Sequence, residues 1–266
     1  MKLTYGNQTI DLLPFDKIPK KIILSISGGL DSASVFYLIC KYFPEIDIYP
    51  TTARDIYAPF DADRAIDIVG YMKLTFPNSK IHDHHIYDLD DLDPVMLDRV
   101  RTGDLAHLNV GYNRDRGAVK GLTMSQRLID YYAKIAGIES VKFCSNKSWF
   151  DLESYMDSDV LVVNGMTRNP SDAEMKKNNF YHLAERRRDH KPNKPIIEFW
   201  GVTYTPYANV DKKFVSAMFY TYNLMTDLFP ITNSCVGTKT QTDYFTKVCN
   251  ECFWCKEKYW AFNQYK

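Results

Sequence analysis

The segment from Lys21 to Tyr42 joins a buried strand, a glycine turn and a helix in one uninterrupted run, and it constrains the fold more than any other part of the chain. An almost continuous apolar run comes first, formed by Ile22, Ile23, Leu24 and Ile26. Such a run is typical of a central parallel strand that is covered on both faces. After the turn, apolar residues recur at intervals of three and four until Pro44, which predicts a helix that ends there.

The turn itself reads Ser27-Gly28-Gly29-Leu30-Asp31-Ser32. Two glycines let the backbone approach a ligand closely, and the helix that follows directs free N–H groups and a partial positive charge at it. Ser27 and Ser32 add hydroxyl groups, while Asp31 can cap the helix or hold a cation. The complete string therefore favours a phosphate-binding turn over an ordinary capped turn. Neither a G-x-x-x-x-G-K-[ST] loop nor a G-x-G-x-x-G motif occurs in the chain.

Composition limits the classes of protein to be considered. The chain has 266 residues, 45% of them hydrophobic, which is enough for one large domain or a domain with an appendage. Its 33 basic and 33 acidic residues cancel, so no overall field attracts nucleic acid or an anionic membrane. The N-terminus lacks the apolar core of a signal peptide, and no segment reaches the length of a membrane span. We expect a cytoplasmic protein without a membrane or nucleic-acid partner.

The first third of the chain continues the strand and helix pattern. Residues 1–19 are expected to form an edge strand or arm, and a second strand begins at Ile46. A helix is predicted from Asp61 to Leu74. The loop between them belongs at the ligand-binding edge of the sheet, where Arg54 and Asp55 are candidate contacts, although a solvated loop explains them equally well.

A third strand is predicted from Ser79 to Tyr87, and it carries three histidines, His82, His84 and His85. An acidic run follows, made of Asp88, Asp90, Asp91 and Asp93. Because alternation along a strand separates His85 from the other two, we favour a solvated face over a metal site here. Between Val95 and Gly121 the pattern is weak, as in a substrate-covering segment or a plain loop.

The second half of the chain continues the alternation of predicted strands and helices. A helix is predicted from Thr123 to Ala136, and Lys142 to Tyr155 is interpreted as a helix or an insertion. The apolar strand Asp159–Val163 runs into Asn164-Gly165, an edge that can present polar side chains to a ligand, with a plain turn as the alternative. Further on, we predict a strand from Ile196 to Tyr204 and a helix from Val210 to Phe229. The basic run 185–194 is interpreted as a solvated linker, with a phosphate or nucleic-acid contact as the alternative.

Four of the six cysteines lie near the C-terminus, at Cys235, Cys249, Cys252 and Cys255. Four thiolates at this spacing complete a tetrahedral, closed and therefore structural zinc site. An iron–sulfur cluster uses the same ligands and stays open as a competitor. Cys40 and Cys144 are interpreted as apolar fillers.

The SGGLDS turn resembles the PP-loop of the ATP pyrophosphatase superfamily, which binds the pyrophosphate end of ATP while a substrate oxygen is adenylated. Together with the tail that begins at Asn233-Ser234-Cys235, and with Tyr204-Thr205-Pro206, it resembles the 7-cyano-7-deazaguanine synthase (QueC) family. The resemblance implies a doubly wound parallel α/β sheet of the adenine nucleotide α-hydrolase type in residues 1–205. It implies a small helical zinc-binding subdomain in residues 206–266.

The resemblance also implies site residues. ATP binding and catalysis fall to the turn, with Ser27, Asp31 and Ser32 as the catalytic residues and Gly28, Gly29 and Leu30 as further ATP contacts. A second set of binding residues follows the strand that ends at residue 163. It consists of Asn164 and Gly165 for the nucleotide and of Arg168 and Asp172 for the substrate. The four C-terminal cysteines hold the structural Zn²⁺.

By this resemblance the chain is an ATP- and Mg²⁺-dependent ligase that releases AMP and pyrophosphate. It adenylates 7-carboxy-7-deazaguanine and joins ammonia, and it forms the nitrile through an amide. Because the middle segment 88–159 departs from the family pattern, a PP-loop enzyme acting on another carboxylate or a tRNA base remains an alternative. A zinc-bearing nucleotide-binding or nucleic-acid-binding module without turnover is the second alternative. The oligomeric state is left open, with a homodimer among the options.

Overall fold

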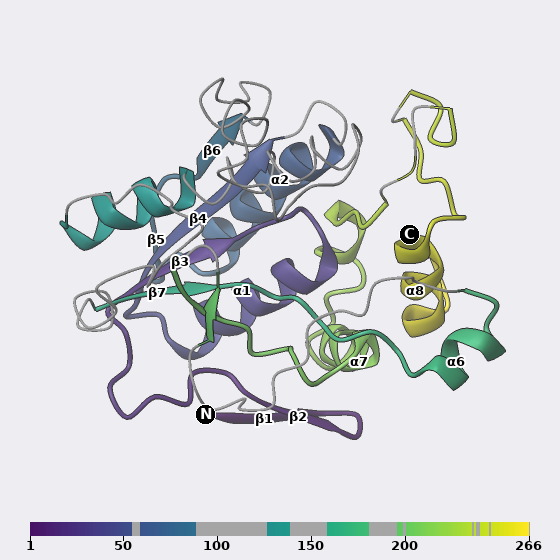
Figure 1. Cartoon of the computed structure of the whole chain (residues 1–266), viewed down its shortest axis with the longest axis horizontal. Helices are drawn as coiled ribbons and strands as arrows, with labels where there is room; N and C mark the ends of the chain where they lie inside the picture. Colours follow the sequence, from purple (N-terminus) through teal and green to yellow (C-terminus); the bar gives the residue numbers. More distant parts are fainter. Residues whose placement is uncertain are drawn as a thin grey trace, which may run out of the picture.

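The computed structural model describes residues 1–54, 59–88, 127–138, 159–180, 196–198, 201–235, 237, 240–244 and 246–265. In this part of the chain a mostly parallel sheet forms the centre, with helices packed on both of its faces (Figure 1). The predicted α/β class with a parallel sheet is therefore confirmed.

The main sheet has seven strands in the described part of the chain. They are β3 (Lys21–Ser25), β4 (Asp47–Arg54), β5 (Lys80–Ile81), β6 (His85–Asp88), β7 (Val160–Val163), β8 (Ile196–Glu198) and β9 (Gly201–Tyr204). Their order is β5-β4-β3-β7-β9-β8, and β6 also pairs with β4. All pairings are parallel except that of β8 with β9. The chain thus starts at the centre, runs to one edge and returns to the other.

Strand β3 lies at the centre, as its apolar run predicts. Ile23 is in register with Tyr49 of β4 on one side and with Val162 of β7 on the other. Ile22, Ile23 and Leu24 have no exposed surface. Because both neighbours run parallel to β3, the glycine turn after Ser25 lies at the carboxyl edge of the sheet, where ligands bind in open α/β folds.

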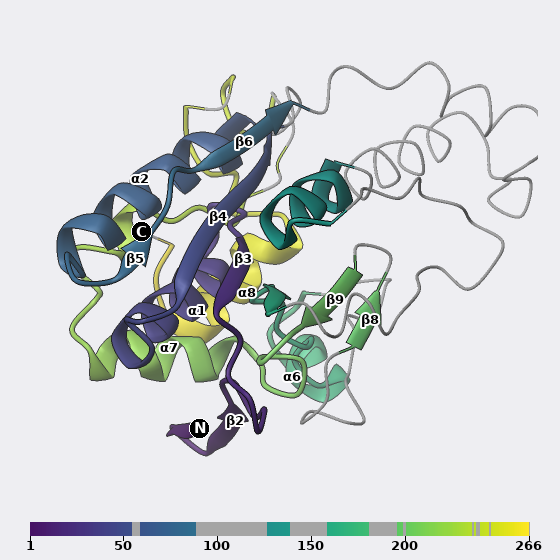
Figure 2. The same cartoon turned by 90° about the vertical axis from the view of Figure 1, so that its left-hand side faces the viewer.

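Helices cover both faces of the sheet (Figure 2). Helix α1 (Leu30–Tyr42) follows the glycine turn and is followed after β4 by α2 (Pro59–Thr75) on the same face. The helix over residues 127–136 lies on the opposite face, where the Tyr132 hydroxyl donates to the Val160 carbonyl oxygen at 3.3 Å. This distribution of helices is the doubly wound arrangement.

The N-terminal segment forms its own hairpin and not an edge strand of the main sheet. Strands β1 (Lys2–Tyr5) and β2 (Gln8–Asp11) pair antiparallel around Gly6, whose φ of +60° suits glycine. The Tyr5 hydroxyl lies 2.6 Å from that of Tyr222, which lies 2.6 Å from that of Tyr42. These bonds tie the hairpin to the helical layer.

The C-terminal region packs onto the same core. It contains α7 (Lys212–Thr221), the short 3₁₀ helix η2 (Phe229–Ile231) and α8 (Phe253–Phe262). The side chains of Phe214, Phe219 and Phe262 belong to the apolar cluster that also contains the central strand. Helix α6 (Asp172–Lys177) lies beside α8, where Met175 and Phe180 contact Phe253. The division at residue 205 stays a prediction.

Three predicted elements differ from the structure. The strand from Ser79 to Tyr87 is two short strands, β5 and β6, with residues 82–84 between them, both paired with the long β4. The strand from Ile196 to Tyr204 is the antiparallel pair β8 and β9. The helix predicted over 210–229 ends at Thr221, because Asn223 takes a left-handed conformation with φ of +56°.

Other predictions lie outside the described residues. They concern Asp55, Cys144, the acidic run after Asp88, the weak segment 95–121, the possible helix or insertion 142–155 and the basic run 185–194. Among the described residues, no helix is both long and apolar enough to cross a membrane.

Candidate functional site

The glycine turn forms a cradle at the start of α1. Gly28 has a φ of +76°, which favours glycine, and Gly29 is the N-cap residue of the helix. No side chain of the described residues caps this helix. The first N–H groups of a helix lack intrahelical acceptors, so those that follow Gly29 are suited to an anion.

The two serines of the turn are joined to each other. The Ser27 backbone N–H donates to the Ser32 Oγ at 3.2 Å, and the two hydroxyl oxygens are 3.3 Å apart. Ser32 Oγ donates in turn to the Gly29 carbonyl oxygen at 3.1 Å. Ser32 is buried and Ser27 is exposed. Ser32 therefore shapes the turn, and the Ser27 hydroxyl is the one open to a ligand.

The segment after β7 meets the start of α1. A Cβ atom at Gly165 would lie 2.4 Å from the carbonyl oxygen of Asp31, so only glycine allows this close approach. Two residues further, the buried Thr167 hydroxyl donates to Asp31 Oδ2 at 3.0 Å. Asn164 turns the other way, because its Oδ1 accepts from the Met166 N–H and the Thr205 hydroxyl. Asn164 thus holds the segment in place, while Gly165 and Thr167 contact the turn.

Asp31 is paired with a lysine that is buried. Lys212, the first residue of α7, places its Nζ 3.0 Å from Asp31 Oδ1 and 3.3 Å from Glu257 Oε2 of α8. The side chains of Lys212 and Glu257 are 2% and 0% exposed, and that of Asp31 is 19% exposed. The ammonium group therefore lies under the glycine turn between two carboxylates.

The turn is also joined to the loop that leads to the cysteines. The Asn233 N–H donates to the Gly28 carbonyl oxygen at 2.8 Å, and Asn233 Oδ1 accepts from the Cys235 N–H at 3.0 Å. A Cβ atom at Gly29 would be 3.4 Å from the Ser234 Oγ. Asn233 thus connects Cys235 to the glycine turn through two hydrogen bonds.

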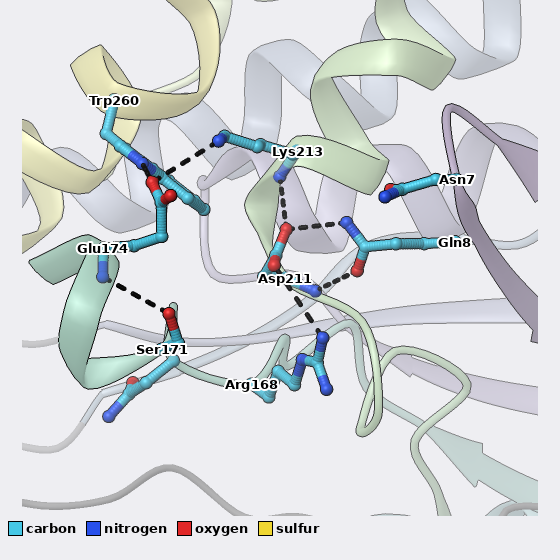
Figure 3. Close-up of a pocket in the computed structure, with 9 residues that line it drawn as sticks. Asn7, Gln8, Arg168, Ser171, Glu174, Asp211, Lys213 and Trp260 are labelled. Atoms are coloured by element: carbon cyan, nitrogen blue, oxygen red, sulfur yellow. Dashed lines mark hydrogen bonds and ion pairs between the residues drawn. The ribbon is translucent and has the colours of Figure 1, made fainter.

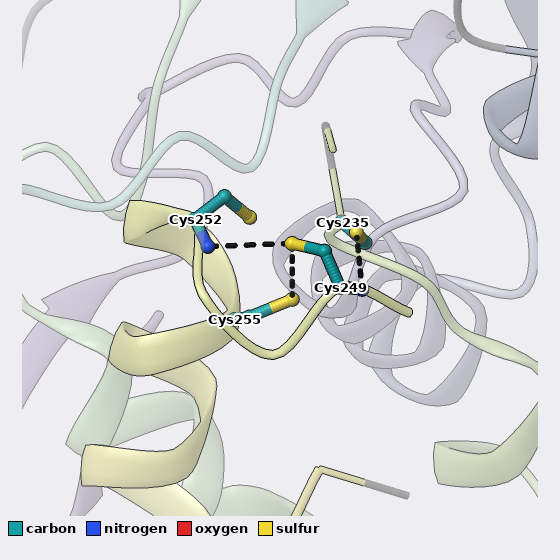
Figure 4. A group of neighbouring side chains, drawn as sticks. All are labelled: Cys235, Cys249, Cys252 and Cys255. Atoms are coloured by element: carbon teal, nitrogen blue, oxygen red, sulfur yellow. Dashed lines mark hydrogen bonds between the residues drawn. The ribbon is translucent and has the colours of Figure 1, made fainter. Parts of the chain in front are cut away.

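The four predicted ligand cysteines come together, as Figure 4 shows. Their Sγ atoms all lie within 4.8 Å of one another, and within the described residues no other group of His, Cys, Asp or Glu side chains forms such a set. The N–H groups of Gly237 and Cys249 donate to Cys235 Sγ at 3.4 and 3.2 Å, and the Cys252 N–H donates to Cys249 Sγ at 3.3 Å. Amide donors of this kind stabilise thiolates.

The chemistry of this set fits a zinc ion. The pKa of Cys235 is raised to about 11, mainly by a hydrogen bond with Cys252. The pKa of Cys255 is raised mainly by hydrogen bonds with Cys235 and Cys252. Thiols this close together do not readily ionise at the same time, because the negative charges of neighbouring thiolates repel one another. A divalent cation reverses that balance, since it binds thiolates directly. The four cysteines would hold the ion and close its coordination, which is the structural kind of site.

The two predicted substrate residues lie apart from the turn. Arg168 lines a pocket of about 310 Å³ between the β1–β2 turn, α6, the start of α7 and the C-terminal part of α8 (Figure 3). Its guanidinium lies 3.9 Å from Asp211 Oδ2, and Lys213 lies 3.6 Å from Glu174 Oε2. Both cations of the pocket thus have carboxylate neighbours. Asp172 is exposed in the first turn of α6 and does not line this pocket.

The three histidines have separate partners. His82 Nε2 lies 2.7 Å from Asp47 Oδ1, His84 Nε2 lies 2.8 Å from the Thr52 hydroxyl, and the ring of His85 stacks on Tyr131. Burial lowers the pKa of His84 to about 4, so this ring is neutral at pH 7. Arg54, the other candidate contact, lies 3.4 Å from Asp88 at the exposed edge of the sheet.

Three residues of the site carried no prediction, namely Thr167, Lys212 and Glu257. A lysine at a helix N-terminus is a signal that could have drawn attention to Lys212, because its charge opposes the helix dipole. Thr167 and Glu257 have no comparable local signal.

Comparison with protein-family models finds no match, and a search of curated proteins finds none either. Among solved structures, the chain is similar to the NMN synthetase from Francisella tularensis, with a TM-score of 0.42 and 11% sequence identity. The match covers 92% of this chain and 85% of that one. A likeness this remote supports no transfer of substrate or activity. The structure itself defines the class, a doubly wound α/β protein with a four-cysteine cluster that can bind zinc.

Proposed function

We propose that the chain is an ATP-dependent ligase that adenylates a carboxylate, releases pyrophosphate and joins ammonia to the activated acyl group. One observation carries this proposal. The turn combines an uncapped helix start, two serine hydroxyls and a carboxylate, Asp31, that is held between Thr167 and the buried Lys212. A polyphosphate and its divalent cation need this combination of N–H groups, hydroxyls, one carboxylate and one lysine.

Each group has a role in this chemistry. The N–H groups at the start of α1 and the Ser27 hydroxyl bind phosphate oxygens, and the Asp31 carboxylate can accept Mg²⁺. Lys212 adds a positive charge beneath the turn that stabilises negative charge as pyrophosphate leaves. The substrate carboxylate oxygen attacks the α-phosphorus, the bond to pyrophosphate breaks, and ammonia then displaces AMP to give an amide.

The glycine turn and the cysteine tail resemble those of the 7-cyano-7-deazaguanine synthase family, and this resemblance supports 7-carboxy-7-deazaguanine as the substrate. A second adenylation, on the amide oxygen, followed by loss of AMP would give 7-cyano-7-deazaguanine. The nitrile therefore consumes two ATP and one ammonia. The described residues contribute orientation and charge, and their contacts do not identify a residue that binds the deazaguanine ring.

The test is product analysis on purified protein with ATP, Mg²⁺, ammonium and this carboxylate. We expect AMP and pyrophosphate in equal amounts, with the nitrile detected by mass spectrometry. Asp31→Asn should lower turnover by about 10²–10³-fold, because it removes the charge that organises both Lys212 and the cation. Asp67→Asn, at an exposed carboxylate on α2, is the matched control and should leave the rate unchanged.

Two results contradict the proposal in different ways. Formation of ADP and orthophosphate would reject adenylation altogether. AMP formed with another carboxylate, while this one is ignored, would reject the substrate and retain the adenylating class. ATP binding without any turnover over a panel of carboxylates would favour a nucleotide-binding module.

A further inference from the structure

Lys212 is held by two carboxylates that come from opposite ends of the chain. Asp31 belongs to the glycine turn, and Glu257 belongs to α8, the helix that begins within the cysteine cluster. The distances from Nζ, 3.0 and 3.3 Å, are similar, but Glu257 is 0% exposed whereas Asp31 is 19% exposed. Glu257 is thus the partner that solvent screens least.

The position of Lys212 makes a second carboxylate necessary. A buried ammonium group is stable only when paired, and at the first position of α7 it also meets the positive end of that helix. Asp31 by itself supplies one negative charge, which it shares with Thr167 and, in the proposed reaction, with a cation. Glu257 supplies a second negative charge beside the Lys212 ammonium group.

The cysteine cluster lies next to Glu257 along α8. Cys252 is the N-cap residue of α8 and Cys255 lies in its first turn, two residues before Glu257. A metal ion bound by these cysteines would fix the first turn of the helix and with it the Glu257 carboxylate. Three residues further along the helix, the Trp260 indole donates to Glu174 Oε2 at 2.8 Å, which ties α8 to α6.

We propose that Glu257 is a positioning residue for Lys212, and that the four-cysteine metal site sets the glycine turn for phosphate chemistry through the chain of contacts from α8 to Glu257, Lys212 and Asp31. The catalytic consequence rests on the proposed function. The coupling itself rests on the contacts alone. It makes the metal site a part of the phosphate site and not only a fastening of the C-terminus.

Lysine labelling tests the coupling without any substrate. The purified metal-containing protein is pulsed with an acetylating reagent, and modification of each lysine is followed by peptide mass spectrometry. In the wild type, Lys212 should react far more slowly than its neighbour Lys213, which is 50% exposed. Glu257→Gln, which keeps shape and removes charge, should raise Lys212 labelling by about tenfold or more while Lys213 is unchanged. Glu251→Gln, an exposed glutamate beside Cys252, is the matched control and should change neither rate.

Removal of the metal should act in the same direction. Chelation should expose Lys212 to labelling, and restoring zinc should protect it again. Equal protection of Lys212 in wild type, Glu257→Gln and metal-free protein would overturn the proposal. If Glu257→Gln yields little folded protein, the double variant with Lys212→Met decides. Folding restored by removing both charges supports the pair, and folding that stays lost shows that Glu257 serves another partner.

Kinetics provide the second readout. In a Glu257→Gln variant that retains one metal ion per chain, kcat should fall by about tenfold or more, because Lys212 acts on the leaving pyrophosphate. The KM for ATP should change by less than about threefold. A change confined to KM would overturn the positioning role. If the wild type releases no AMP, the proposed function fails, and the labelling result still decides the coupling.

Discussion

Gly165 controls how closely the segment after β7 approaches the start of α1. A Cβ atom there would meet the carbonyl oxygen and carbon of Asp31 at 2.4 and 2.6 Å, and neither backbone atom can rotate away. We predict that Gly165→Ala lowers the free energy of unfolding by about 1–3 kcal/mol. It should also reduce turnover, since the contact of Thr167 with Asp31 depends on this approach. Urea denaturation and AMP release measure the two effects.

Gly70 provides the matched control for this substitution. It lies inside α2, and a Cβ atom added to it has no heavy atom within 4 Å. Gly70→Ala should therefore stabilise the protein by about 0.5–1 kcal/mol, because alanine restricts the unfolded chain more than glycine. A Gly165→Ala protein that is as stable and active as the wild type would show that the segment can move away at no cost.

At the scale of single residues, prediction from sequence reached the turn and the metal ligands but not the residues around them. The glycines, serines and Asp31 are contiguous, and the cysteines have a regular spacing, so local chemistry is enough to propose them as sites. Thr167 and Lys212 contact Asp31 from 136 or more positions away, and Glu257 in turn contacts Lys212. Such contacts depend on the topology of the sheet, which no local pattern encodes.

The cysteine cluster at the start of α8 is predicted to bind a metal ion. We expect one zinc ion per chain, because the four Sγ atoms lie within 4.8 Å of one another and backbone N–H groups donate to them. Cys252→Ser should lose most of the metal and destabilise α8. The control is Cys40→Ala, which changes a buried cysteine of the core and should keep the full metal content. Elemental analysis measures both.

Zinc affinity should fall as the pH falls, because protons compete for the thiolates. A hydrogen bond with Cys252 and burial raise the pKa of Cys235 to about 11 when no cation is bound, so this competition is strong. Stoichiometric iron with a visible absorption band would identify an iron–sulfur cluster instead. Full metal retention in Cys252→Ser would reject the ligand set.

At the scale of elements, long periodic segments could be predicted and short edge strands could not. The strand and helix within residues 21–42 follow their apolar patterns closely. The run from Ile196 to Tyr204 contains few polar residues, so a hairpin of two short strands resembles one strand, and only Gly201 hints at the break. In the helix that begins at Lys212, the left-handed Asn223 marks the end that the apolar pattern overruns.

The whole molecule brings the two ends of the chain to one place. The Asn233 N–H bonds to the Gly28 carbonyl oxygen, and the carboxylate of Glu257 contacts the lysine that pairs with Asp31. Phe262 packs in the same core as the central strand. The two motifs, which lie about 200 residues apart in the sequence, are therefore parts of one connected region, with Lys212 between them.

The central claim is that a carboxylate oxygen is transferred to the α-phosphorus of ATP at this region. Isotope transfer measures this directly, with 7-carboxy-7-deazaguanine that carries ¹⁸O at both carboxylate oxygens, together with ATP, Mg²⁺ and ammonium. We predict two AMP for each nitrile, each AMP with one ¹⁸O atom, and pyrophosphate without label. Unlabelled AMP, or ADP with orthophosphate, would contradict the account.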